Sequence, residues 1–328
     1  MSKNKLWHKR LQIERGEIRT WSRRGRSYHG KRWRVRNTIL RTGLKLLRLH
    51  ARGEQNALNP IIRRLHFTFD TLPEVFHGFT ILHLTDLHAD GLPGLADCLH
   101  DRLRDLEVDL CVLTGDYRFR DYGPCDAVYP HMARILSAVN ARRGIVGVLG
   151  NHDCAEMVPE LARLGVKVLV NEALEVRHGA HGIWLIGLDD PHYYGCDDLP
   201  GALLDVPQEA FKILLVHTPE MIAEAAQHAI QLYLCGHTHG GQICVPFVGP
   251  LITHAACARR FVRGAWRYQH LQGYTNTGVG VSGVPVRFLS PPEIGLIELH
   301  PSACLATPHP AGMLQELCPS CHVTSSSR

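Results

Sequence analysis

Residues 232–241 read Leu-Tyr-Leu-Cys-Gly-His-Thr-His-Gly-Gly. The first residues form a short apolar run, which is typical of a buried strand, and Gly236 marks the point where the strand ends. Two histidines, His237 and His239, follow directly. Because alternate residues of an extended segment lie on the same face, both imidazoles can point at one metal ion.

The same pattern of a short apolar run ending in a polar cluster recurs along the chain from residue 78. The apolar runs are 79–84, 108–113, 145–149, 183–188, 213–216 and 232–234. Helical patterns lie between the first of them, near 94–106 and 127–141. Alternating buried strands and helices predict a layered α/β domain. After residue 241 the chain turns to Gly, Pro and β-branched residues, as in 275–288 and 295–299, which predicts a strand-rich second half.

Polar side chains that could bind metal follow five of the six apolar runs. These residues are Asp86, His88, Asp116, Asn151, His152, Asp153, His217, His237 and His239. Ligands of α/β sheets bind outside the carboxyl ends of the strands, so we expect these residues to meet at one rim. Carboxylate, amide and imidazole groups together favour Mn, Fe or Zn. They exceed the needs of one ion, and Asp116, at a tight strand exit after Gly115, suits a bridge between two.

The ordered series D-x-H, G-D, G-N-H-D, H and G-H-T-H resembles the calcineurin-like metallophosphoesterase superfamily over residues 78–300. This resemblance implies a four-layer α/β/β/α sandwich, which we expect over residues 65–300. It also implies two divalent metal ions, with manganese as the first choice and iron, zinc or cobalt as alternatives. The implied reaction is hydrolysis of a phosphodiester or pyrophosphate bond by a hydroxide that the two metals activate.

The resemblance assigns a role to each residue of the set. The first metal would be held by Asp86, His88 and His239, the second by Asn151, His217 and His237, and Asp116 would bridge them. His152 would stabilise or protonate the leaving oxygen, with Asp153 as its orienting partner.

One position departs from the pattern of many relatives. A second acidic residue often stands three positions after the bridging aspartate, and here that position is Phe119. Two arginines, Arg118 and Arg120, flank it and could bind a second phosphate or a carboxylate of the substrate. The alternative, that both arginines are solvated or structural, stays open.

A finer resemblance is to the UDP-2,3-diacylglucosamine pyrophosphatase-like phosphodiesterases of bacteria. It is carried by residues 236–250 and by the glycine- and proline-rich segment 278–293. Members of this subgroup often begin with a membrane-proximal segment. The resemblance therefore implies a lipid-linked or nucleotide substrate hydrolysed at a membrane surface.

Residues 1–64 form a basic arm that holds 19 Lys and Arg but only 3 Asp and Glu. Within it, 33–48 predicts an amphipathic helix with an apolar stripe beside a basic face. Such a helix can lie on an anionic membrane, so we expect residues 31–50 to contact one. A helix that packs on its own domain and a solvated arm are the alternatives. No recognition motif accompanies the charge, so nucleic acid is not expected as a partner.

Composition limits the class of protein further. The 328 residues are 45% hydrophobic and 20% charged, which excludes a disordered or fibrous chain. The sequence contains no run of 18 apolar residues, so we expect no helix that spans a membrane. Eleven cysteines without regular spacing predict reduced thiols, and hence a cytoplasmic protein. Together with the basic arm, this predicts a peripheral position on the inner face of the membrane. Residues 301–328 predict a flexible tail.

Two alternatives to a membrane-bound phosphodiesterase stay open. A soluble phosphoesterase acting on nucleotides or small phosphate esters is the main alternative, and a non-catalytic scaffold is the other.

Gly278-x-Gly280-x-x-Gly283 lacks a βαβ context, so we expect no dinucleotide cofactor. Cys318-Pro-Ser-Cys321-His322 matches haem attachment only by its letters.

Overall fold

The computed structural model describes residues 3–19, 31–250 and 252–302. The predicted flexible tail, apart from its first two residues, and the Cys-Pro-Ser-Cys-His motif therefore lie outside the described residues, as does 20–30 of the basic arm. Among the described residues, no helix is long and apolar enough to cross a membrane.

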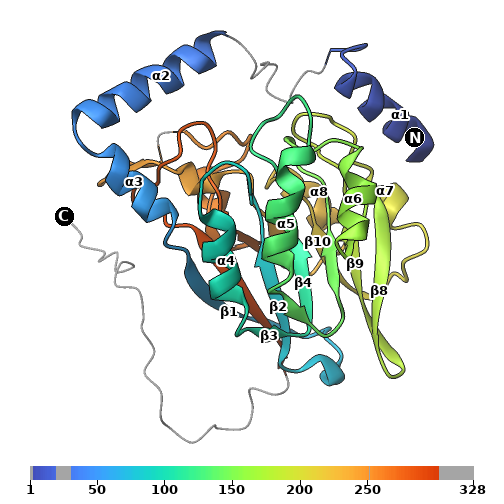
Figure 1. The fold of residues 1–328 in the computed structure, drawn as a ribbon. Helices are drawn as coiled ribbons and strands as arrows, with labels where there is room; N and C mark the ends of the chain where they lie inside the picture. Colours follow the sequence, from blue (N-terminus) through green and yellow to red (C-terminus); the bar gives the residue numbers. More distant parts are fainter. Residues whose placement is uncertain (1–2, 20–30, 251, 303–328) are drawn as a thin grey trace, which may run out of the picture.

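Two six-stranded sheets form the centre of the molecule (Figure 1). The first has the order β1-β16-β2-β4-β6-β7, and the second has the order β14-β15-β11-β10-β9-β8. The strands of the first sheet are β1 (Ile61–Phe69), β16 (Glu293–Pro301), β2 (Phe79–Leu84), β4 (Leu110–Leu113), β6 (Ile145–Gly147) and β7 (Val166–Val168). Those of the second are β14 (Gly264–Tyr268), β15 (Leu271–Thr275), β11 (Leu232–Cys235), β10 (Phe211–Leu215), β9 (His181–Gly187) and β8 (Glu172–His178). Two small two-stranded sheets are also present. One pairs β3 (Glu107–Val108) with β5 (Asn140–Ala141), and the other pairs β12 (Cys244–Val245) with β13 (Gly249–Pro250).

Helices cover the outer faces of both sheets. The first sheet carries α4 (Leu95–Leu103), α5 (Tyr129–Leu136) and α6 (Met157–Arg163), and the second carries α7 (Leu199–Ala202) and α8 (Ile222–Gln227). Short 3-10 turns occur at η1 (Glu74–Phe76), η2 (Asp126–Val128), η3 (His239–Gly241) and η4 (Arg259–Phe261).

Three apolar cores lie between these layers. One packs helices on the first sheet, one fills the space between the sheets, and one packs helices on the second sheet. The predicted four-layer α/β/β/α sandwich is therefore confirmed.

Strand direction brings the polar loops together. In the first sheet β2, β4 and β6 are parallel, and in the second β9, β10, β11 and β15 are parallel. The loops after these strands contact one another across the sandwich, as when the imidazole of His217 meets the carbonyl of Thr114 at 2.7 Å. One rim therefore collects the carboxyl ends of both sheets, as predicted.

Two regions differ from what the sequence suggested. All six predicted apolar runs become strands, and β12 to β16 confirm the strand-rich second half, but 276–288 is not itself a strand. β15 ends at Thr275, and the backbone that follows binds the loop after β2 through Gly280 N–H and Asp86 O at 2.8 Å. Left-handed φ angles at Gly278 and Gly283 also prevent continuous pairing. Conversely, β1 was not predicted, and it begins four residues before the expected domain start.

Three helices precede β1. The predicted amphipathic helix is present as α2 (Lys31–Leu46), while α1 (Lys3–Glu14) and α3 (His50–Ala57) were not predicted. Figure 1 shows α1 and α2 at the same end of the molecule, above the loops that follow the parallel strands.

Candidate functional site

Side chains from five strand ends converge at the rim of the sandwich. Their ligand atoms form two buried groups, each within 4.8 Å: Asp86, His88 and His239, and Asp116, His217 and His237. Asp116 lies between the groups, because its Oδ2 atom is 3.2 Å from His217 Nε2 and 3.6 Å from His88 Nε2. The structure thus brings together the residues that the sequence singled out.

The possible ligand atoms within each group lie close to one another. In the first, Nε2 of His239 is 3.3 Å from Oδ1 of Asp86 and 3.2 Å from Nε2 of His88. In the second, Nε2 of His217 is 3.3 Å from Nδ1 of His237 and 3.1 Å from Oδ1 of Asn151. Each group could hold one cation, and Asp116 could contact both.

Main-chain carbonyls fix the orientation of three of these imidazoles. His88 Nδ1 donates to Arg118 O at 2.7 Å, and His217 Nδ1 donates to Thr114 O at the same distance. His237 uses the opposite nitrogen, because its Nε2 lies 3.4 Å from His254 O. In each ring the other nitrogen then carries its lone pair into the centre, as partners behind a metal-binding histidine arrange it.

A buried carboxylate oxygen of Asp86 also indicates that a metal ion can bind here. Oδ2 of Asp86 accepts hydrogen bonds from His237 N at 2.9 Å and Thr85 Oγ1 at 3.0 Å. Oδ1 has no hydrogen-bond partner among the described residues, although it is buried. An unsatisfied buried oxygen is costly, and a cation next to the neighbouring imidazoles would satisfy it. The donor set therefore fits divalent metal ions.

The backbone is strained at these positions. Five of the predicted ligands have left-handed φ angles between 37° and 70°: Asp86, His88, Asp116, His237 and His239. Each such residue costs of order 1–3 kcal/mol, and such strain clusters at functional sites. The loops are therefore bent so that these side chains, rather than glycines, occupy the tight exits of the strands.

Charge is concentrated at the centre of the site. Burial would raise the pKa of Asp116, but His217 and His152 hold it well below its usual range. Burial opposes charge on His217 as well, yet Asp116 raises the pKa of that imidazole to about 10. Burial raises the pKa of Asp86 to about 6. Without a metal, the second group therefore attracts a proton into the position where a cation would sit.

His152 lies at the mouth of the site. Its side chain is 16% exposed, and its Nε2 is 3.9 Å from Asp116 Oδ2. Its Nδ1 contacts Phe119 O at 2.8 Å, and its backbone N–H donates to Asp116 Oδ1 at 2.8 Å. The exposed edge of this imidazole can thus reach a ligand bound over the buried groups.

Asp153 takes a different position from the one expected. Its carboxylate is buried and accepts the backbone N–H groups of Gly150, Asp116 and Tyr117 at 2.7–2.8 Å. The hydrogen bonds from Asp116 and Tyr117 tie the loop after β4 to the loop after β6, and the bond from Gly150 lies within the latter loop. The carbonyl of Phe119, rather than the Asp153 carboxylate, binds the ring of His152.

Arg118 and Arg120, which flank Phe119, lie in different environments. Arg118 is 4% exposed and donates to His152 O and to Gly123 O, both at 2.6 Å, so it braces the loop of His152. Arg120 is exposed. Arg118 therefore uses its guanidinium on main-chain oxygens, whereas Arg120 reaches solvent.

Two further arginines contact the site without having been predicted. Arg287 is fully buried, and its Nη2 lies 3.2 Å from His239 Nδ1. Arg10 of α1 donates to Asp153 O at 2.6 Å and pairs with Asp189. Nothing near Arg10 in the sequence indicates that it is buried. Arg287 stands in an apolar run, which could have suggested that its side chain is buried.

Comparisons with known proteins agree with this geometry. Residues 79–241 match the calcineurin-like phosphoesterases. The metallophosphoesterase YkuE of Bacillus subtilis is 32% identical over 239 residues, which cover 70% of this chain and 81% of YkuE. The chain belongs to the calcineurin-like phosphoesterase family. It is therefore a metal-dependent phosphoester hydrolase, and the predicted superfamily is confirmed.

Two further proteins are similar to this calcineurin-like phosphoesterase at lower sequence identity. Phosphodiesterase YaeI of Escherichia coli is 29% identical over 231 residues, which cover 67% of this chain and 82% of YaeI. Among solved structures, phosphopantetheinyl hydrolase PptH of Mycobacterium tuberculosis aligns with a TM-score of 0.41 and 10% identity, over 61% of this chain and 89% of PptH.

Proposed function

We propose that this phosphoesterase binds two divalent metal ions and hydrolyses phosphodiester or pyrophosphate bonds. Asp86, His88 and His239 would hold one ion, and Asn151, His217 and His237 the other, with Asp116 between them. When bound, the ions would supply an activated water and neutralise charge on the phosphoryl oxygens. Manganese is the first candidate, because the mixed carboxylate, amide and imidazole set suits it, and iron, zinc or cobalt could replace it.

The observation that carries this proposal is the convergence of acceptor atoms. Nε2 of His217 lies 3.2 Å from Oδ2 of Asp116 and 3.1 Å from Oδ1 of Asn151. When the His217 ring is neutral, its Nδ1 proton goes to the carbonyl of Thr114, which leaves Nε2 as an acceptor. Acceptors that face one another in a buried site repel unless a cation or a proton lies between them.

His152 would act on the leaving group. Its carbonyl-bound Nδ1 fixes the ring, and its partly exposed edge faces the place where a substrate would lie over the buried groups. A positioned imidazole can donate a proton to the departing oxygen. We further propose that Asp153 and Arg118 position this loop through main-chain contacts, and that Arg120 contacts a substrate anion.

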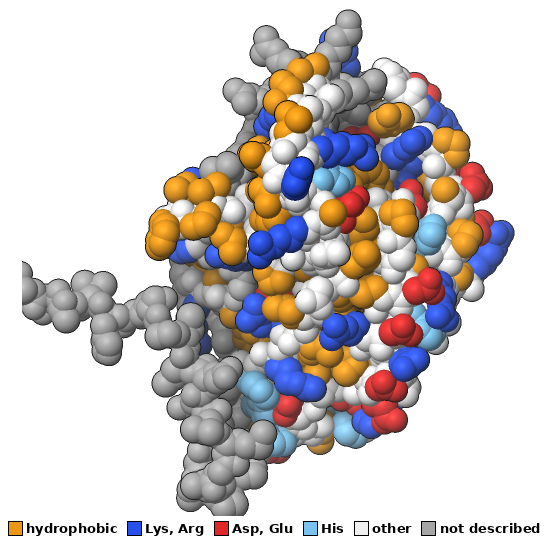
Figure 2. Space-filling model, turned by 60° about the vertical axis from the view of Figure 1, so that its left-hand side comes forward, with side chains coloured by type: hydrophobic (Ala, Val, Ile, Leu, Met, Phe, Trp, Pro, Cys, Tyr) orange, Lys and Arg blue, Asp and Glu red, His pale blue; other side chains and the backbone are white. Residues whose placement is uncertain are grey.

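We also propose that the substrate is lipid-linked and that the enzyme works at an anionic membrane surface. Helix α2 exposes Val35, Ile39 and Leu46 by 55%, 67% and 80%. Arg41 and Lys45 on the same helix are exposed too. Figure 2 shows hydrophobic side chains gathered on the side of the molecule that carries α2 and α3, with Lys and Arg beside them. Apolar and basic groups together are what an anionic bilayer attracts.

The proposed membrane surface borders the active site. A pocket of about 120 Å³ is lined by Arg36 and Leu40 of α2 and by Thr238, His239 and Ile252. Because this pocket connects the helix to a predicted metal ligand, a lipid-linked phosphate could reach the site without leaving the bilayer. All eight described cysteines are free, which suits the reducing cytoplasmic face that the sequence predicts.

The reaction is tested with metal-stripped enzyme to which Mn²⁺ is added back. A phosphomonoester, a phosphodiester and UDP-2,3-diacylglucosamine are compared, each with and without liposomes. The proposal predicts that cleavage of the diester or the lipid nucleotide depends on Mn²⁺ and is lost in Asn151→Ala. Metal-independent cleavage, or full activity of Asn151→Ala, would contradict it.

The membrane proposal is tested separately by co-sedimentation with phosphatidylglycerol vesicles and with phosphatidylcholine vesicles. The triple variant Ile39→Glu, Leu46→Glu, Leu47→Glu should lose binding to the anionic vesicles. Leu204→Glu is a control for one added charge, because Leu204 is 83% exposed on another part of the chain. Equal sedimentation of both variants would favour the alternative, a soluble phosphoesterase acting on nucleotides or small phosphate esters.

A further inference from the structure

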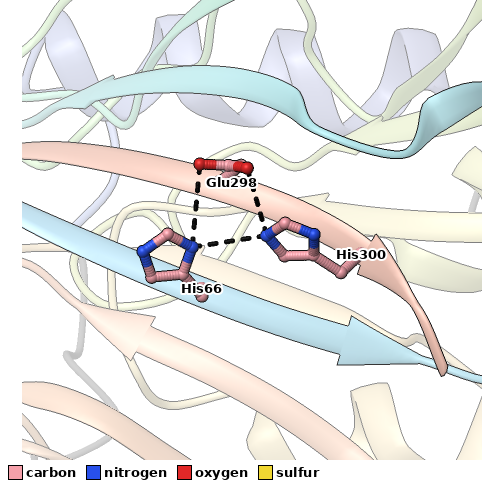
Figure 3. Close-up of side chains that lie close together, drawn as sticks. All are labelled: His66, Glu298 and His300. Atoms are coloured by element: carbon pink, nitrogen blue, oxygen red, sulfur yellow. Dashed lines mark hydrogen bonds and ion pairs between the residues drawn. The ribbon is translucent and has the colours of Figure 1, made fainter. Parts of the chain in front are cut away.

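A second cluster of possible metal ligands lies far from the active-site rim. His66 belongs to β1, and Glu298 and His300 belong to the neighbouring strand β16. Figure 3 shows the three side chains facing one another across the two strands. Because β16 runs antiparallel to β2, its carboxyl end lies at the opposite end of the sheet from Asp86. The cluster is therefore separate from the phosphoesterase site.

The strands hold these side chains in fixed positions. His66 and Glu298 are paired residues in the parallel register of β1 and β16, and His300 is two residues farther along β16, on the same face. The neighbouring positions Phe67 and Leu299 point the other way, into the core between the sheets. A regular sheet, rather than a mobile loop, thus sets the spacing of the three donors.

The distances fit the size of a zinc ion. His66 Nδ1 is 3.3 Å from His300 Nε2, and the Glu298 carboxylate lies 3.2 Å from His300 Nε2 and 3.7 Å from His66 Nδ1. Zinc–nitrogen bonds of about 2.0–2.1 Å place two ligand atoms of a tetrahedron about 3.3 Å apart. The three donors could therefore bind one ion with little movement.

The chemistry of the donors also suits zinc. Two imidazoles and one carboxylate form a three-ligand set that leaves a fourth position for water. Burial, together with the nearby His77 and His66, lowers the pKa of His300. The side chain of His66 is 64% exposed, which gives an ion access from solvent.

We propose that His66, Glu298 and His300 form a second metal site, which binds Zn²⁺ and joins the edge strand β1 to β16. Because β1 is the edge of the first sheet and follows the N-terminal helices, an ion here would stabilise the attachment of that segment. The site takes no part in hydrolysis.

The proposal is tested on the full chain by equilibrium dialysis against Zn²⁺ followed by elemental analysis. The wild-type protein should retain one zinc equivalent more than His66→Ala or His300→Ala. His181→Ala is the control, because His181 is also exposed but lies on β9 of the other sheet. Equal zinc contents in the wild type and both cluster variants would overturn the proposal.

Two further readouts separate this site from other zinc-binding groups. Zn²⁺ should raise the Tm of the Mn²⁺-loaded wild type but not that of His300→Ala, while phosphodiester hydrolysis is the same in both. The difference in zinc content should persist when Cys304, Cys318 and Cys321 are replaced by Ser in the full chain. Its disappearance in that background would assign the extra ion to the tail and overturn the proposal.

Discussion

Arg10 Nη2 lies 2.6 Å from the carbonyl oxygen of Asp153, so helix α1 contacts the loop that carries His152. The guanidinium is fully buried, pairs with Asp189, and lies 3.8 Å from the centre of the Tyr194 ring. Glu14, one turn farther along α1, accepts the backbone N–H of Ala155 at 3.0 Å. The N-terminal helix is therefore built into the support of the active site.

Replacement of Arg10 should destabilise the protein and slow catalysis. Arg10→Met leaves the buried carboxylate of Asp189 without its partner, which costs about 3–5 kcal/mol. Urea denaturation measures this loss, and kcat should fall because Asp153 O loses a donor. Arg15→Met is the control, since the Arg15 side chain is 67% exposed and its loss should cost less than about 0.5 kcal/mol. Equal stability of the two variants would show that α1 is not part of the folded unit.

His152→Ala should affect substrates according to their leaving groups. If His152 donates a proton to the departing oxygen, its loss should lower kcat about 10²–10⁴-fold for an alkyl leaving group. Nitrophenolate leaves without protonation, so a nitrophenyl diester should be affected much less. Metal content should stay the same, because His152 is not among the proposed ligands. An equal loss of kcat for both substrates would point to a role in binding or folding instead.

His83 should make the stability of the protein depend on pH. Burial lowers its pKa from 6.5 to about 3, so the folded state keeps the ring neutral while the unfolded state takes up a proton below pH 6.5. This contribution is complete above pH 6.5 and declines as pH falls towards 3, by up to about 1.4 kcal/mol per pH unit. Urea denaturation of wild type and His83→Gln between pH 7.5 and 4.5 should show a shallower decline in the variant. Parallel curves would contradict this assignment.

The positions of the site residues could be predicted because each follows a strand whose carboxyl end lies at the same rim. Asp86, Asn151 and His217 all stand directly after a short apolar run, and parallel strands must end at the same edge. The sequence thus contains the placement of these residues without any tertiary information. The orientation of each ring is different, because it depends on a carbonyl from another loop, such as Thr114 O behind His217.

Features that depend on long-range contacts could not be predicted. Arg10 and Asp189 are 179 residues apart, and an arginine in a basic arm looks like a solvated one until its partner is known. β1 was hidden in the same way, since Arg63 and Arg64 continue the charge pattern of the arm. The β-branched residues over 275–288 suggested a strand, yet their backbone binds the loop after β2 instead.

Mn²⁺-dependent hydrolysis of bis(p-nitrophenyl) phosphate by the wild type and by Asp116→Asn is the most direct test of the proposed two-metal site. The substitution preserves the size of the side chain but removes the charge that lies between His88 and His217. We expect Mn²⁺ to restore activity to the metal-stripped wild type and to leave Asp116→Asn at least about 10³-fold slower, with less bound metal. Full activity and full metal content in Asp116→Asn would contradict the account.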